Sequence, residues 1–220
     1  MSATFQLPTD LFLLKHPFYQ AWVDGKLNLS TLKDYAEQYY HHVAAFPQYL
    51  EQAAKICVNS EARTVLEENL ADENGEGYGT PHPELWLQFA EGVGASRTNV
   101  FDARLRSGIT KVVQTFTDLS KASFAQSLGA LYAYESQVPE IAESKINGLR
   151  AHYGINDAKT LSFFEVHRVA DVEHRQRLLK VIETLPELER KQAEQAAAKA
   201  CQALWDFLTD VQIVNQISCA

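Results

Sequence analysis

The sequence predicts an all-α protein, and three observations lead to this fold class. Apolar residues recur at the spacing of a helix rather than at the alternating spacing of a strand. No two strand-like runs are joined by a hairpin turn. Most of the 10 glycines and 7 prolines stand where helices would begin or end. Because the 220 residues show no shift in composition, no linker and no repeat, we expect a single domain over residues 1–220.

The first two predicted helices precede a glycine cluster at residues 75–79. One begins near Ser30, a plausible N-cap, and Pro47 kinks or interrupts it. The next begins at Ser60 and must end at the glycine cluster, where left-handed backbone stops a helix.

The middle of the chain is predicted to hold one short and one long helix. The short helix runs from Pro83 to Gly92, and no element is assigned to residues 96–119. The long helix covers residues 120–149, with the serine at its first position as N-cap and an interruption or bend at Pro139.

Two more long helices are predicted in the last third of the chain. They cover about 157–185, ending before Pro186, and 187–213, which contains the strong helix-forming run EQAAAKACQALWDFL. The total is about seven or eight helices, with a poorly determined tail at about 211–220.

Composition excludes several classes of function. The 20 Lys and Arg residues against 28 Asp and Glu residues leave a net charge of −8, which argues against nucleic acid as a partner. No apolar run approaches the roughly 20 residues of a membrane span, and the N-terminus lacks the basic region of a signal peptide. The odd, widely spaced Cys57, Cys201 and Cys219 indicate a reducing cytoplasm without a disulfide framework.

One helix face carries two imidazoles and a carboxylate. His167, Asp171 and His174 stand at positions i, i+4 and i+7, within roughly 60° of arc on a helix. This spacing suits a divalent metal with nitrogen and oxygen ligands, although a solvated polar face has the same pattern. Apolar Phe163 and Leu178 continue the stripe, which indicates that the three polar residues point into the core, where unpaired charge is costly.

A further candidate ligand is Glu135, in the apolar and aromatic segment ALYAYESQVPEIAESK. A buried glutamate needs a cation. The cation is either a metal or an arginine of a neighbouring helix, and the residues alone leave both open. The following Pro139 is expected to deform the helix here.

Glu73 and His82 flank the glycine-rich turn. Such a turn can bring two ligands from opposite sides onto one ion, but ordinary capping at a helix junction explains the same residues. Glu76 is a competing ligand, whereas Glu84 fits better as a first-turn residue favoured by the helix dipole.

These segments together supply the donors of a carboxylate-bridged dinuclear site inside a helical bundle. Two divalent ions and three carboxylates would leave about one positive charge for a bound anion. The paired Glu-x-x-His motifs of ferritin-like sites do not occur, so the site must belong to another helical scaffold. The predicted metal ligands are Glu73, His82, Glu135, His167, Asp171 and His174.

Several segments resemble the CADD family (protein associating with death domains), which belongs to the haem-oxygenase-like dimetal oxidases and is related in fold to TenA and PqqC. The resemblance covers the chain from about residue 10 to residue 210 and implies a haem-oxygenase-like helical bundle. YESQVP with a downstream lysine and the HxxxDxxH spacing are its specific features. The segments are HPFYQAW, YAEQYYHHVAAFPQYL, NLADENG, HPELW, ALYAYESQVPEIAESKINGL and HxxxDxxH.

The resemblance implies that the protein makes p-aminobenzoate for folate from its own side chains. A tyrosine would supply the ring, a lysine the nitrogen, and dioxygen would be activated at an Fe/Fe or Fe/Mn centre. Tyr19 matches the proposed sacrificial residue, and Tyr35 and Tyr134 match further active-site tyrosines. Lys145 matches the nitrogen donor.

The family pattern also maps onto the six metal ligands, with one departure. The family's first ligand pair is spaced Glu-x6-His, whereas Glu73 and His82 are spaced Glu-x8-His. The two extra residues align within the GEGYGT turn, where an insertion is easily accommodated, so the choice of Glu73 over Glu76 stays open. A homodimer and an external reductant are further expectations.

Two of the family assignments have simpler explanations in the residues themselves. Lys145 follows Glu135 by ten residues, about 15 Å along a straight helix. It would reach the metal site only if the distortion at Pro139 and its own long stem bring it inward, and it is otherwise a surface lysine. Tyr19 is one of 9 tyrosines and 11 phenylalanines, most of which fill the core.

Three other functions remain as alternatives. The metal site could act on an external small molecule over many turnovers. A TenA-like or PqqC-like enzyme without p-aminobenzoate synthesis is the second, although no cysteine is a good candidate for the TenA nucleophile. An interaction module with an acidic helical surface is the third, but it leaves the core-facing carboxylates and histidines unexplained.

Overall fold

The computed structural model describes residues 5–76 and 79–217, and every regular element in these ranges is a helix. The all-α fold class is therefore confirmed. None of the described helices is both long and apolar enough to cross a membrane. In chain order the elements are η1 (Thr9–Leu11), η2 (Leu13–Lys15), α1 (Pro17–Val23), α2 (Leu29–Ile56), α3 (Ser60–Glu73), α4 (His82–Gly92), α5 (Arg97–Phe101), α6 (Ser107–Ala122), α7 (Phe124–Glu135), α8 (Val138–His152), α9 (Ala158–Thr184) and α10 (Glu187–Val214).

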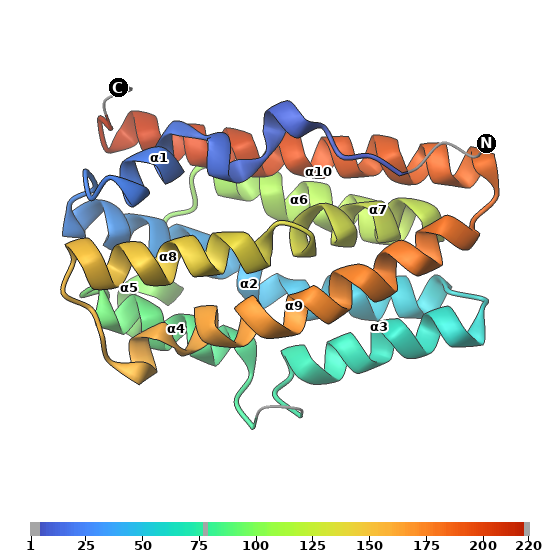
Figure 1. Cartoon of the computed structure of the whole chain (residues 1–220), viewed down its shortest axis with the longest axis horizontal. Coiled ribbons are helices and arrows are strands. Elements are labelled where there is room, and N and C mark those ends of the chain that lie inside the picture. The colour runs from blue at the N-terminus through green and yellow to red at the C-terminus, as the bar shows by residue number, and fades with distance from the viewer. Residues whose placement is uncertain (1–4, 77–78, 218–220) are drawn as a thin grey trace.

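The long helices lie along the longest axis of the molecule, and α9 crosses them obliquely (Figure 1). Helix α10 packs on α6 and α7, whereas α9 packs on α8 and α4. Helix α2 joins the two groups through contacts with α6, α3 and α4. The N-terminal segment with η1, η2 and α1 runs beside α10.

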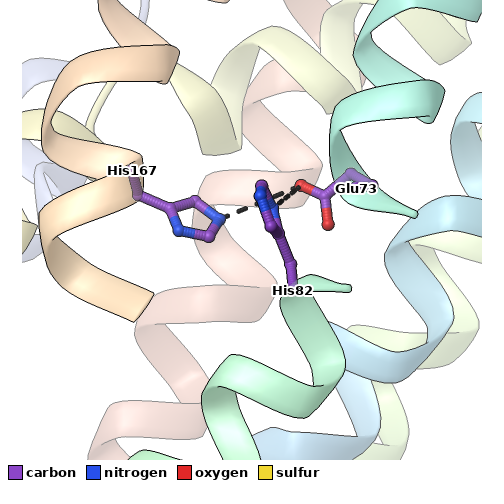
Figure 2. Close-up of side chains that lie close together, drawn as sticks. All are labelled: Glu73, His82 and His167. Carbon is purple, nitrogen blue, oxygen red and sulfur yellow. Dashed lines mark ion pairs between the residues drawn. The ribbon is translucent and has the colours of Figure 1, made fainter. Parts of the chain in front are cut away.

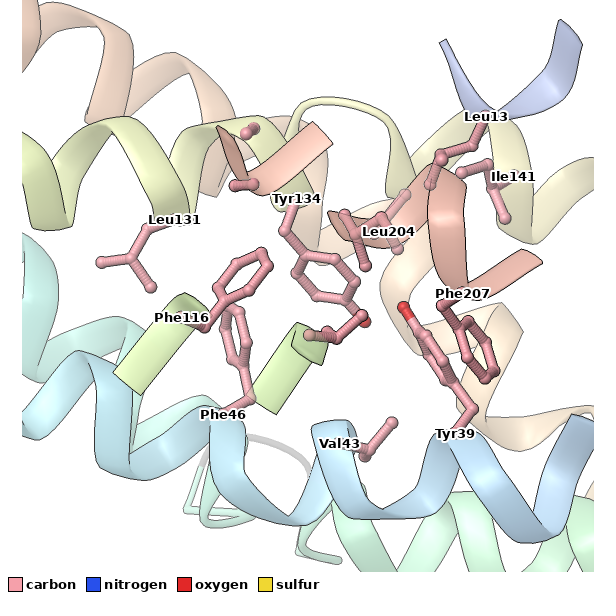
Figure 3. Packing of buried hydrophobic residues seen from close by; sticks show 14 of the residues in the cluster. Leu13, Tyr39, Val43, Phe46, Phe116, Leu131, Tyr134, Ile141, Leu204 and Phe207 are labelled. Atoms are coloured by element: carbon pink, nitrogen blue, oxygen red, sulfur yellow. The ribbon is translucent and has the colours of Figure 1, made fainter. Parts of the chain in front are cut away.

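Aromatic side chains fill the centre of the bundle. Figure 3 shows Phe46 and Tyr39 of α2 facing Phe116 of α6, Tyr134 of α7 and Phe207 of α10. All five side chains are buried. Fixed aromatic packing of this kind positions the polar side chains that enter the same interior.

Close contact between α7 and α10 depends on small residues. A Cβ built on Gly129 would lie 2.1 Å from the carbonyl oxygen of Ala193. The alanine-rich face of α10 is buried against this contact. Only glycine at position 129 allows the two backbones to approach this closely.

The described residues contain ten α-helices, more than the seven or eight expected. Two short helices, α1 and α5, add to the count. Residues 96–119, to which the sequence assigns no element, divide between α5 and α6. The long helix predicted for residues 120–149 is two helices, α7 and α8, separated by Ser136 and Gln137. Pro139 lies in the first turn of α8, where its missing N–H costs nothing, so the predicted interruption is confirmed.

Two of the predicted helix starts are wrong. Ser120 lies inside α6 and donates its hydroxyl to the Thr117 carbonyl, whereas Ser123 caps α7 by accepting from the Gln126 N–H. Helix α2 is capped by Asn28 rather than Ser30. Several residue types that favour caps stand within three positions of each other, and only their tertiary setting decides between them.

Helix α2 continues through Pro47 without interruption. Its buried aromatic face packs along both sides of the proline, and this packing compensates for the lost backbone hydrogen bond. At the other end of the chain, α10 extends to Val214, into the predicted tail. Of the predicted features, Gly77 and Cys219 lie outside the described residues.

Candidate metal centre and aromatic chamber

Three of the predicted ligands converge in the interior. Glu73 ends α3, His82 begins α4, and His167 lies on α9 (Figure 2). The Glu73 Oε1 atom is 3.0 Å from His82 Nδ1 and 3.9 Å from His167 Nε2. Their ligand atoms lie within 4.8 Å of one another, so these buried side chains could hold a metal ion.

The turn between α3 and α4 brings Glu73 to His82. Gly75 has a φ of +82°, and a Cβ there would lie 2.5 Å from the Pro81 nitrogen. The turn therefore requires glycine at this position. The structure places Glu73 beside His82 and leaves Glu76 exposed, so a spacing of Glu-x8-His brings the pair together.

The electrostatics of this group favour an ionised glutamate. Burial raises the pKa of Glu73, but the His82 and His167 imidazoles outweigh it and hold that pKa below its ordinary value. Burial lowers the pKa of His82, and the Glu73 carboxylate outweighs it and raises that pKa. A metal ion would replace the proton shared by this pair.

His167 is held in the tautomer that a metal ligand needs. Its Nδ1–H donates to the Phe163 carbonyl oxygen at 2.7 Å, one turn earlier on α9. The Nε2 atom then faces Glu73 with a free lone pair. Burial lowers the pKa of His167, which keeps the imidazole neutral.

The other three predicted ligands form a second group on α7 and α9. The His174 Nδ1 atom is 3.4 Å from Asp171 Oδ1, and its Nε2 donates to Asp72 Oδ2 at 3.0 Å. Glu135 Oε1 accepts from the Asn69 amide at 2.8 Å. Burial opposes the charge of His174, but the neighbouring carboxylates outweigh it and raise its pKa to about 9.

Two carboxylate oxygens in this group are buried without a hydrogen-bond partner among the described residues. They are Oε2 of Glu135 and Oδ2 of Asp171. A buried carboxylate oxygen without a partner is costly, and burial accordingly raises the pKa of Glu135 to about 8. Cations bound at these atoms would remove that cost, so the residues present fit metal ions with hard oxygen and nitrogen ligands.

Two polar neighbours on α3 were not identified from the sequence. Asn69 holds Glu135, and Asp72 holds His174. Asn69 stands four residues before Glu73, on the same helix face. This spacing could have identified Asn69 from the sequence, whereas no pattern in the sequence points to Asp72.

His42 is not among the predicted ligands, and it is fully buried beside them. Neither ring nitrogen has a hydrogen-bond partner among the described residues. Its ring contacts Phe116 and Tyr134 with centroid separations of 4.7 Å and 5.0 Å. Burial lowers its pKa to about 3, so the imidazole is neutral.

A buried amine lies in an aromatic chamber next to these groups. Lys145 projects inward from α8, and its Nζ donates to the Tyr35 hydroxyl at 2.7 Å. The same Nζ lies 5.5 Å from the Tyr19 ring centroid and 5.3 Å from that of Trp86. Burial holds the pKa of Lys145 well below its ordinary value, which favours the neutral amine.

Tyrosines connect this chamber with the ligand groups. Tyr19 and Tyr35 are hydrogen-bonded to each other, and so are Tyr39 and Tyr134. Figure 3 shows the hydroxyl ends of Tyr39 and Tyr134 turned towards one another. Burial raises the pKa of Tyr134, and the nearby carboxylates raise it further, so the phenol keeps its proton. Tyr134 directly precedes Glu135 in α7.

The described cysteines are buried and have structural contacts. The Cys57 thiol donates to the Asn59 carbonyl oxygen, and Cys201 accepts from the Gln137 side chain. Burial raises the pKa of both thiols, which disfavours the nucleophilic thiolate. Neither cysteine therefore suits a TenA-like nucleophile.

Comparison with known proteins gives consistent matches along the chain. A family described as an iron-containing redox enzyme matches residues 33–206. A protein of Nitrosomonas europaea named 4-aminobenzoate synthase is 40 % identical over 215 residues, which cover 90 % of this chain and 85 % of the relative. Its namesake from Chlamydia trachomatis is 35 % identical over 89 % of this chain and 84 % of the relative.

Solved structures share the fold at much lower identity. A domain of unknown function from Shewanella denitrificans, described as having a heme oxygenase-like fold, aligns with a TM-score of 0.81 and 16 % identity over 94 % of this chain and 88 % of its own. A CADD-like protein of unknown function from Nostoc punctiforme aligns with a TM-score of 0.75 and 20 % identity over 96 % of this chain and 91 % of its own. These alignments confirm the haem-oxygenase-like fold.

Proposed function

The chain belongs to the family of iron-containing redox enzymes that is shared with the 4-aminobenzoate synthases, and we propose that it is itself a 4-aminobenzoate synthase that consumes its own side chains. Tyr19 would supply the ring and Lys145 the nitrogen. The observation that carries the proposal is a neutral amine enclosed among tyrosines, 2.7 Å from the Tyr35 hydroxyl, beside the buried carboxylates and histidines.

We further propose that the six predicted ligands hold two metal ions, as an Fe/Fe or an Fe/Mn pair. Glu73, His82 and His167 form one group, and the remaining ligands are Glu135, Asp171 and His174 on α7 and α9. Bound there, the ions would supply the oxidising equivalents of dioxygen, with electrons from an external reductant. The hard donors and the two carboxylate oxygens without partners support this assignment.

The side chains of the chamber prepare the amine and the phenols. Burial lowers the pKa of Lys145 and so disfavours its protonation, and the hydrogen bond to Tyr35 fixes where the nitrogen lies. The same burial raises the pKa of Tyr19 far above its ordinary value, so its proton leaves only when the ring is oxidised. Water is largely excluded, because the cavity between these side chains measures about 20 Å³ and holds one water molecule at most.

The small volume also favours an internal source of the product over an external substrate, since a cavity of about 20 Å³ has no room for an aromatic ring. A homodimer and a cytoplasmic location are further parts of the proposal. Each chain would complete one turnover, because removal of a tyrosine side chain is irreversible.

The test exposes reduced, iron- and manganese-loaded protein to dioxygen and measures both 4-aminobenzoate and the intact mass of the chain. We expect at most one equivalent of product, with a matching loss of mass. Tyr19→Phe should suppress the product and retain the metal, whereas the matched change Tyr40→Phe, at a half-exposed position on α2, should not. Product above one equivalent per chain would instead show an external substrate. Product at the normal yield from Tyr19→Phe would exclude Tyr19 as the ring source.

A further inference from the structure

Trp86 lies between the first ligand group and the aromatic chamber. It follows His82 by one turn of α4, so both side chains leave the same face of that helix. The Trp86 ring meets the Phe163 ring at a centroid separation of 4.8 Å, and Phe163 stacks on the His167 imidazole at 4.0 Å. A continuous series of ring contacts therefore connects Trp86 with the ligand group drawn in Figure 2.

The other contacts of Trp86 lead into the chamber. Its ring centroid lies 5.8 Å from that of Tyr35 and 5.1 Å from that of Tyr39. The Lys145 Nζ atom lies 5.3 Å from the centroid of the same indole. One fully buried side chain thus touches the tyrosines and the amine on one side and the ligand group, through one phenyl ring, on the other.

The two other tryptophans lack the contact with the ligand group. Trp22 lies 5.6 Å from the Lys145 Nζ atom. Its ring contacts are with Phe18, Tyr35 and Tyr153. Trp205 packs on His16. Within the part of the chain that the structure describes, Trp86 is therefore the indole whose ring contacts reach both the ligand group and the chamber.

We propose that Trp86 relays one electron from Tyr35 to the metal centre, which on the proposed function holds the oxidising equivalents of dioxygen. Indole and phenol side chains are oxidised by one electron far more easily than the phenyl ring of Phe163, which only bridges the gap. In the first step the indole gives one electron to the oxidised centre and becomes a radical cation. In the second step Tyr35 gives one electron to that radical cation and restores Trp86.

The hydroxyl proton of Tyr35 has an acceptor within hydrogen-bond distance. A phenol that has lost an electron is a strong acid, so its proton passes to a nearby base. The Lys145 Nζ atom lies 2.7 Å from the Tyr35 hydroxyl, and burial lowers the pKa of Lys145 and so favours the neutral amine that accepts a proton. The products are a neutral phenoxyl radical at Tyr35, an ammonium at Lys145 and a metal centre that has gained one electron.

Trp86 has no such acceptor, which makes it a relay rather than the final site of the radical. Its Nε1–H donates to the Ala36 carbonyl oxygen at 2.9 Å, and a backbone carbonyl is too weak a base to take the proton. The indole radical cation therefore keeps its proton and is reduced by Tyr35. Tyr39 touches the same indole, but its hydroxyl is bonded to that of Tyr134, which is a phenol and not an amine.

The step between Tyr35 and Trp86 is tested without metal or dioxygen. In the full chain with Trp22→Phe and Trp205→Phe, Trp86 is the one tryptophan left of three. An ultraviolet laser flash ionises this indole, and transient absorption follows the indole and phenoxyl radicals. We expect the indole signal to decay as the phenoxyl signal grows. Adding Tyr35→Phe should abolish this conversion, whereas the matched change Tyr39→Phe, one turn further along α2, should retain it.

The step between Trp86 and the metal centre is tested with the metal-loaded protein. After exposure to dioxygen and rapid freezing, the wild-type chain should show a phenoxyl radical by electron paramagnetic resonance. Trp86→Phe should retain the metal and lose this radical. The matched change Trp22→Phe, which removes an equally buried tryptophan beside Lys145, should keep the radical.

A phenoxyl radical in Trp86→Phe at the wild-type yield would overturn the proposal. An indole radical that decays in the single-tryptophan chain without forming a phenoxyl radical would overturn it as well, and so would conversion that persists in Tyr35→Phe. If the wild-type chain forms the radical but no 4-aminobenzoate, the proposed synthesis fails and the electron path through Trp86 stands.

Discussion

Glu135→Gln should stabilise the metal-free protein at neutral pH, although it removes a predicted ligand. Glu135 is only 2 % exposed, and its Oε2 has no hydrogen-bond partner among the described residues. Burial raises the pKa of this carboxyl from 4.5 to about 8. The unfolded chain loses the proton first as pH rises, so stability falls between pH 4.5 and pH 8 and the full cost is present above pH 8.

The expected change in unfolding free energy follows from the difference between the two pKa values of Glu135, 4.5 and about 8. Each pH unit above 4.5 costs about 1.4 kcal/mol, so the penalty at pH 7 is about 3 kcal/mol. A glutamine carries no charge but brings an amide donor that lacks a partner, which costs about 1 kcal/mol. The net gain in unfolding free energy should be about 2 kcal/mol at pH 7 and near zero at pH 5.

Urea unfolding in the presence of a chelator, at both pH values, measures this difference. Glu143→Gln, at an exposed position on α8, is the matched control and should change stability little at either pH. A gain that is the same at pH 5 and pH 7, or a loss at pH 7, would show that burial does not raise the pKa of Glu135 in this way.

Two further changes test the metal site and the helix packing. His174→Ala should abolish stoichiometric metal binding and leave the far-ultraviolet circular dichroism helical, and full metal occupancy in this variant would rule out His174 as a ligand. Gly129→Ala should destabilise the protein by about 2–3 kcal/mol in urea unfolding, because its Cβ would overlap the backbone of Ala193. The same change at exposed Gly94 has no neighbour within 4 Å and shows the cost of strained backbone alone, since its φ is +92°.

The sequence alone predicts which polar side chains share one helix face, because helical spacing is a local property. The i, i+4, i+7 pattern of His167, Asp171 and His174 follows from the geometry of one helix, and the structure has all three buried on α9. Their assignment as metal ligands stays a prediction. The all-α class followed equally from periodicity summed over long segments.

The features that could not be predicted from the sequence depend on contacts between distant segments. Lys145 points inward because α7 ends at Glu135 and a separate helix, α8, begins at Val138. In the sequence, Pro139 indicates an interruption here but not the direction of the second helix. The hydrogen bonds from His174 to Asp72 and from Asn69 to Glu135 join residues far apart in the chain. The choice of Ser123 over Ser120 as a helix cap was likewise decided by packing rather than by residue type.

Because a two-residue link joins α7 and α8, the rotation of one helix about its axis does not fix the rotation of the other. If the chain continued as one helix, each added or deleted residue would turn Lys145 by about 100° relative to Glu135. With the break at Ser136 and Gln137, each helix can be set by its own neighbours. Helix α7 can therefore adapt to changes in the carboxylate and histidine groups, while α8 keeps the Lys145 amine directed at the tyrosines.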